Sequence, residues 1–179
     1  MTNKVRRFFA SLLLFGMLFP LNSMAVPVTP AMVEQAGNTH LLAQNQVERA
    51  SRAKRGVTVY QDRTVASSDE LKNSQGTTLA HVLTLSPRGY VVLSVDTDIT
   101  PIIAQSHDSN FIWEDSPDNV LLHMVTWDME NRLKALPITN AGDKQANNAL
   151  WKNYTEADSG LVAQIARATI YGPLLPSPT

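Results

Sequence analysis

The fold is decided by residues 77–95, which read TTLAHVLTLSPRGYVVLSV. Two apolar runs rich in valine and leucine flank the segment SPRG. Proline suits the second position of a type I turn, and glycine supplies a flexible residue shortly after it. The stretch therefore predicts a β-hairpin with Pro87 and Gly89 in its turn. His81 alternates with leucines on one face of the first run, so we expect a half-buried strand residue there rather than a catalyst.

Further strands are expected on both sides of this hairpin. Residues 101–106, PIIAQS, predict a strand, since proline is tolerated at a strand's first residue. Residues 56–61, GVTVYQ, predict a short β-branched strand before the hairpin. The intervening residues 62–76 are mostly polar and lack a regular pattern, which predicts a mobile connection.

Helical patterns lie at both ends of the predicted sheet. Residues 28–55 predict a helix in which Thr29 is the N-cap and Pro30 the first helical residue. Residues 138–149, ITNAGDKQANNA, predict a second polar connection. Residues 150–171 predict a weak helix that is broken near residues 159–160.

A more amphipathic helix is expected from Asn119, after a loop at residues 107–119, and Asp118 or Asn119 can cap it. Pro137 is expected to end it. Its buried stripe is predicted to contain four residues at intervals of four, widened by two neighbours. These are Leu121, Val125, Met129 and Leu133, with Val120 and Met124. The whole order predicts an α+β fold, a twisted antiparallel sheet of about four strands packed against two or three helices.

The first 25 residues have the features of a secretory signal peptide. A basic segment precedes an apolar run at residues 8–21, and Ser23 and Ala25 occupy the small-residue positions before the expected cleavage. The alternative, a transmembrane anchor, is disfavoured because the run is shorter than the roughly 18 residues a span needs and contains Pro20. We expect a bacterial protein, secreted or periplasmic, with no stable membrane anchor after cleavage.

Composition excludes several functions for the expected mature chain, residues 26–179. Removal of Lys4, Arg6 and Arg7 leaves twelve basic and sixteen acidic residues, a net charge of −4, which disfavours nucleic acid as a partner. The chain has no cysteine, so a disulfide framework, a thiolate nucleophile and a lipid-modified cysteine are all excluded.

The sequence contains no recognisable catalytic constellation. The four histidines show no metal-binding pair at helical spacing, and the Asp96–Asp98 segment lacks the glycine and distal glutamate of a calcium loop. His107 and Asp108 are expected to form a solvated turn. We therefore predict a non-catalytic binding module with no cofactor and no metal.

The middle of the chain resembles the propeptide domain of streptopain-type cysteine peptidases, a domain that also occurs alone as the Spi-type inhibitor of such peptidases. The matching features are a glycine before an aromatic-valine-aliphatic strand, a second short strand, a phenylalanine, an asparagine before the long helix and a GPLL segment. They correspond to Gly89, Tyr90, Val91, Val92, Leu93, Ser94, Asp96, Ile102, Ile103, Ser106, Phe111, Asn119 and residues 172–175. The chain departs from the pattern at Val95, Ala104 and Gln105.

The resemblance implies an inhibitor of a cognate peptidase that occludes the active-site cleft without a covalent bond. It implies a propeptide-like domain at residues 26–171 and an extended tail at residues 172–179 that resembles the junction with a catalytic domain. It also implies an inhibitory loop at Ser116, Pro117, Asp118 and Asn119, in which the asparagine disturbs the catalytic histidine. An amide can donate and accept hydrogen bonds, but Asn119 could instead merely cap the helix.

Three readings remain open from the sequence. The chain could be a dedicated inhibitor, or the remnant of a zymogen that ends at the junction, in which case Leu174 and Leu175 would lie loosely on the surface. It could also be a secreted or periplasmic binding module unrelated to peptidases. The target peptidase, its affinity and the oligomeric state do not follow from the sequence.

Overall fold

The computed structural model describes residues 26–56, 61–157 and 159–171. The chain forms α1 (Pro30–Lys54), β1 (Thr64–Lys72), β2 (Thr78–Ser86), β3 (Tyr90–Ser94), β4 (Ile102–Ser106), α2 (Val120–Ala135), the 3-10 turn η1 (Leu136–Ile138), α3 (Ala141–Thr155) and α4 (Ser159–Tyr171). The strands form one antiparallel sheet in the order β1-β2-β3-β4. The predicted α+β class is confirmed, and the described residues contain four α-helices rather than two or three.

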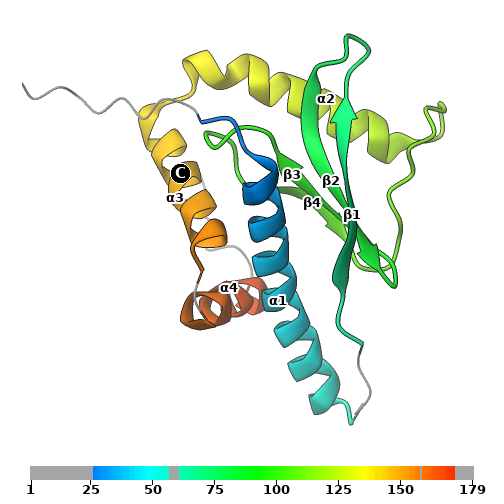
Figure 1. Cartoon of the computed structure of the whole chain (residues 1–179), viewed down its shortest axis with the longest axis vertical. Helices are drawn as coiled ribbons and strands as arrows, with labels where there is room; N and C mark the ends of the chain where they lie inside the picture. Colours follow the sequence, from blue (N-terminus) through cyan, green and yellow to red (C-terminus); the bar gives the residue numbers. More distant parts are fainter. Residues whose placement is uncertain (1–25, 57–60, 158, 172–179) are drawn as a thin grey trace, which may run out of the picture.

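The sheet is covered on both faces, with α2 on one side and α1 on the other (Figure 1). Ala80, Val82 and Val92 face a core with α2, whereas Leu83 and Val91 face a core with α1. Helices α3 and α4 pack against α1 (Figure 1), and the buried Trp151 of α3 joins the core between α1 and the sheet. Because both faces are buried, β3 is buried along its whole length and reads as a continuous apolar run.

The predicted hairpin is confirmed as β2 and β3, which pair with Val82 opposite Val92. The Ser86–Pro87 peptide bond is cis, which is not the bond of the predicted type I turn. Gly89 has a φ of 116°, and a Cβ added there would lie 2.6 Å from the Ser106 carbonyl oxygen. Only glycine therefore fits this position, where the turn meets the end of β4.

The prediction of a connection at residues 62–76 is wrong, because β1 occupies most of this segment. β1 is an edge strand whose side chains are mostly exposed, and Leu71 is its buried residue. Its regularity comes from backbone pairing with β2, which a polar sequence does not reveal. The strand predicted at residues 56–61 includes residues 57–60, which lie outside the described residues, and Gly56 and Gln61 are not in a strand.

The N-terminal helix begins as predicted, since the Thr29 side chain accepts a hydrogen bond from the Met32 amide and Pro30 follows it. Gly37 lies where α1 approaches the sheet most closely. A Cβ added at Gly37 would lie 2.1 Å from Leu83 Cδ1. The glycine therefore lowers helix propensity but permits close packing of α1 on β2.

The prediction of a polar connection at residues 138–149 is also wrong, because α3 begins at Ala141. Asn140 caps α3 by accepting a hydrogen bond from the Asp143 amide (2.8 Å). The helix is polar because its first half holds a buried carboxylate rather than an apolar core: Asn148 Nδ2 donates to Asp98 Oδ1 (2.8 Å), and Lys144 Nζ lies 3.3 Å from Asp98 Oδ2.

The only buried side chain of α3 is Trp151, whose Nε1 donates to the Ile99 carbonyl oxygen (2.9 Å). The helical region breaks between Thr155 and Ser159, as predicted for residues 159–160. Among the described residues, no helix is long and apolar enough to span a membrane.

Candidate functional site

The predicted inhibitory loop lies at the N-terminus of α2, between β4 and that helix. Pro117 and Asp118 are exposed, Ser116 is partly exposed and Asn119 is buried. The Ser116 carbonyl oxygen accepts hydrogen bonds from the Asn119 amide (3.0 Å) and from His123 Nε2 (2.9 Å). The loop is thus held against the first turn of α2.

Asn119 uses every polar atom of its side chain within the chain. Oδ1 accepts from the Leu122 amide (3.2 Å), and Nδ2 donates to the carbonyl oxygens of Ile112 and Glu114 (both 2.8 Å). The first bond caps α2, and the other two fold residues 112–114 back beside its first turn. This geometry favours the capping role of Asn119 over direct contact with a partner's imidazole.

Exposed apolar side chains gather on this loop and on the outer face of α2. We call the following five residues the apolar surface: Ile112 (59% exposed), Trp113 (41%), Val120 (61%), Met124 (63%) and Trp127 (70%). Three of them lie at i, i+4 and i+7 on one face of α2. The bonds of Asn119 to residues 112 and 114 bring the loop beside that face.

Two residues of the predicted buried stripe belong to this surface instead. Val120 and Met124 were expected to widen the core side of α2, but both are exposed, whereas Leu122, Val125 and Met129 are buried. The spacing of apolar residues predicted the helix correctly. It wrongly assigned Val120 and Met124 to the buried face. The outward spacing of Val120, Met124 and Trp127 is the sequence signal that could have revealed the apolar surface.

Trp113 connects the apolar surface to the core. Its ring contacts Phe111 edge to face with centroids 4.8 Å apart, and Phe111 packs in the same way on Tyr90 at 5.3 Å. A hollow of about 480 Å³ opens beside Trp113, between β1 and α2. Its polar lining includes Glu70 and Asp115.

A separate group of histidines lies where α1 meets the end of β4. His40 is buried, its Nε2 donates to Gln105 Oε1, and its Nδ1 has no hydrogen-bond partner among the described residues. His107, which was expected in a solvated turn, is instead half-buried, and its Nε2 has no hydrogen-bond partner among the described residues. Burial lowers the pKa of both histidines. The Tyr154 ring lies 6.0 Å from the His40 ring, and burial raises the pKa of Tyr154.

Two other residues singled out in the sequence, His81 and Asp98, have structural rather than catalytic contacts. His81 is more deeply buried than expected, and burial lowers its pKa. Asp98 belongs to the polar contact with α3 described above. Within the described ranges, no group of three or more histidines, aspartates or glutamates could hold a metal ion.

A scan against protein-family models found no match for this chain, and searches of curated proteins and of solved structures found none either. The likeness to streptopain-type propeptides therefore rests on the sequence motifs. The site itself is defined by its geometry: a loop fastened to a helix start, and an apolar surface that continues from the loop onto the helix.

Proposed function

We propose that this chain is a secreted or periplasmic, non-catalytic inhibitor of a streptopain-type cysteine peptidase, or the remnant of such a zymogen. The apolar surface is the observation that carries the proposal. It flanks the loop at residues 116–119 that the resemblance assigns to peptidase binding, and exposed aromatic residues of this kind commonly anchor protein interfaces.

Inhibition would be non-covalent, because the chain has no cysteine and no activated nucleophile was identified in its sequence. Trp113 and Trp127 are the proposed anchors, since each offers a large ring with a polar N–H at low entropic cost. Asn119 supports the loop through the hydrogen bonds of its side-chain amide. Its role is to hold residues 112–114 against α2, so the loop reaches the partner already ordered.

The direct test is inhibition of a purified, active streptopain-type peptidase by residues 26–179. The expected result is loss of peptidase activity that reverses on dilution. Trp127→Ala should weaken inhibition by about tenfold or more, because interface tryptophans commonly dominate binding. Leu42→Ala is the matched control: Leu42 is 56% exposed and lies on α1, across the sheet.

Full peptidase activity in the presence of a micromolar excess of the folded chain would exclude this function. The second candidate, a binding module unrelated to peptidases, would then keep the same surface. It would be supported if Trp127→Ala, but not Leu42→Ala, abolished capture of a defined envelope component by the immobilised chain.

A further inference from the structure

The charges of this chain are strongly segregated along the sequence. Residues 89–131 contain no lysine or arginine. The same stretch contains eight acidic residues, which are Asp96, Asp98, Asp108, Glu114, Asp115, Asp118, Asp128 and Glu130. This stretch supplies the whole apolar surface, and Glu114, Asp115 and Asp118 lie in the same loop as Ile112 and Trp113.

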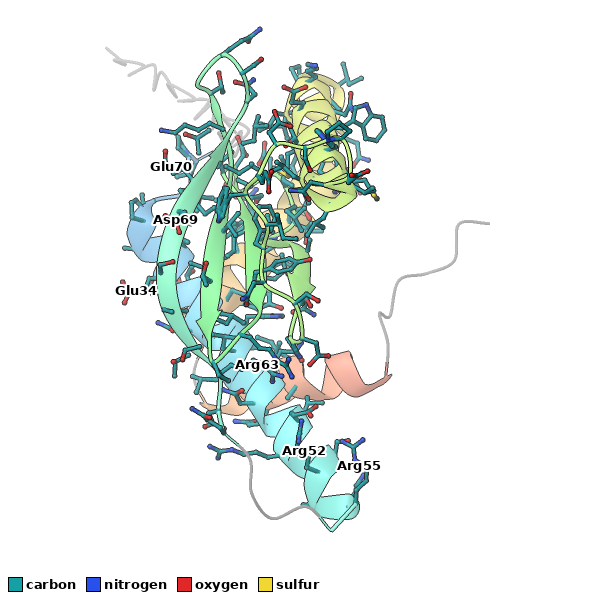
Figure 2. All side chains as sticks on the ribbon, turned by 90° about the vertical axis from the view of Figure 1, so that its right-hand side faces the viewer. Glu34, Arg52, Arg55, Arg63, Asp69 and Glu70 are labelled. Carbon is teal, nitrogen blue, oxygen red and sulfur yellow. The ribbon has the colours of Figure 1, made fainter. Side chains whose placement is uncertain are left out.

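Basic residues gather at the other end of the molecule. Arg52 and Arg55 lie near the C-terminus of α1, and Figure 2 shows them with Arg63 at the end remote from Asp69 and Glu70. The acids near Trp113 are therefore not balanced by this basic group.

The acids beside the loop are also weakly paired in the described structure. Glu114 and Asp118 form no ion pair there, and Asp115 has only His123 nearby, at 3.7 Å. The hollow beside Trp113 adds Glu70 and Glu130, each of which has a lysine partner from its own strand or helix. Glu114, Asp115 and Asp118 therefore give the loop side of the apolar surface a local excess of negative charge.

We propose that the apolar surface binds a partner protein whose contact face is apolar at its centre and rich in lysine or arginine at its edge. This deepens the proposed function and rests on it for the identity of the partner, a peptidase. Charge complementarity is the argument: basic side chains at the edge would meet Glu114, Asp115 and Asp118 while the apolar centre covers Trp127. A basic side chain beside Trp113 would meet an aromatic face as well as carboxylates.

Other occupants fit this surface less well. A second copy docked through the same surface would bring like charges together. An anionic membrane or a nucleic acid would be repelled by the same acids. The basic end of α1 in another copy has the right charge, but no large apolar side chain is exposed on its last two turns.

The test uses two synthetic probes, so that it does not depend on the peptidase. Both are amphipathic helical peptides with the same leucine face, and the polar face is lysine in one and glutamate in the other. Binding to residues 26–179 is followed by methyl and amide NMR shifts of Met124 and Trp127. The lysine peptide should shift both residues, and the glutamate peptide should not.

Charge and salt provide the quantitative readout. Glu114→Gln should weaken binding of the lysine peptide by about two- to fivefold, as for a single exposed charge pair. Glu34→Gln is the matched control, because Glu34 is an exposed carboxylate on α1 (Figure 2). Raising sodium chloride from about 0.1 M to about 1 M shortens the Debye length from about 10 Å to about 3 Å. We expect the affinity to fall by about tenfold or more.

Equal binding of both peptides, or binding that Glu114→Gln and salt leave unchanged, would overturn the inference. Shifts confined to α1 for the lysine peptide would do the same. The peptidase assay separates the two proposals. Inhibition that is insensitive to salt and to Glu114→Gln would keep the function and reject the basic partner face. Selective binding of the lysine peptide without any inhibition would keep the basic partner face and reject the peptidase as its target.

Discussion

Replacement of Asn119 distinguishes an amide that organises the loop from one that is available to a partner. Asn119→Ala removes three hydrogen bonds: the cap bond from the Leu122 amide and the bonds to the carbonyl oxygens of Ile112 and Glu114. An N-cap is worth about 1 kcal/mol, and each amide–carbonyl bond contributes about 1 kcal/mol. Neighbouring bonds are not additive, so we expect the free energy of unfolding to fall by about 2–4 kcal/mol.

Two further substitutions separate the contribution of the cap bond from that of the two bonds donated by the amide. Asn119→Ser keeps an oxygen that can cap α2 and loses both donors, so its expected cost is about 2 kcal/mol. Asn119→Asp also keeps the cap oxygen, and its charge at the helix N-terminus gains about 0.5 kcal/mol. It replaces the donor with an acceptor 2.8 Å from two carbonyl oxygens, however, so we expect a cost of about 3 kcal/mol or more.

The assay is urea denaturation followed by far-ultraviolet circular dichroism, compared at equal m values. Asp118→Ala is the control, because Asp118 is exposed, and its change should be within about 0.5 kcal/mol. The reasoning would be refuted if Asn119→Ala were as stable as the parent chain, or if Asn119→Asp were as stable as Asn119→Ser. Where Asn119→Ser remains folded, its inhibition of the peptidase should be weaker than that of the parent chain, because the bonds that hold residues 112–114 against α2 are lost.

Three other outcomes follow from the packing described above. Trp151→Phe should lower the free energy of unfolding by about 1–3 kcal/mol in urea titrations, because the buried Ile99 carbonyl oxygen loses its donor. Gly37→Val should lower the free energy of unfolding by about 1–3 kcal/mol, because the new side chain overpacks against Leu83. Adding Leu83→Val should recover part of that loss. Purely additive effects of the two substitutions would contradict the contact. Burial lowers the pKa of His40 below its unfolded value of 6.5. The contribution of this burial to stability is therefore complete above about pH 6.5 and is lost as the pH falls through the folded pKa. His40→Gln should reduce the slope of the free energy of unfolding against pH between about pH 7 and pH 5.

The hairpin and the starts of α1 and α2 were predictable because their signals are local. The turn at Pro87 and Gly89 lies between two apolar runs, and the caps at Thr29 and Asn119 immediately precede their helices. In each case the residues that determine the element are close in sequence.

The two missed elements, β1 and α3, depend on distant partners. β1 is mostly polar and buries only Leu71, and pairing with β2 makes it a strand. α3 is held by Asp98, nearly 50 residues earlier in the chain, and by one buried tryptophan, Trp151. An amphipathic pattern is a weak guide to helices and strands that bury only one or two side chains.

The predicted loop lies at the N-terminus of α2, but the sequence did not predict the apolar surface beside it. The loop at residues 116–119 was identified from the resemblance, whereas the exposure of Val120 and Met124 was not foreseen. Helical periodicity fixes which residues share a face, but it does not determine which of two apolar faces packs on the sheet. Here α2 has two apolar faces, and the face that contains Met129 packs on the sheet.

The sheet divides the molecule into two cores, and this division has a consequence for its dynamics. The core beneath α2 and the core beneath α1 share no side chain, so they communicate through the backbone pairing of the strands. Helix α1 also packs against α3 and α4, and α3 adds Trp151 to its core, whereas α2 is a single outer layer (Figure 1). Native-state hydrogen exchange should therefore resolve two cooperative units, with α2 opening at lower free energy than α1. The layer that carries the apolar surface can adjust to a partner while the α1 layer keeps its packing.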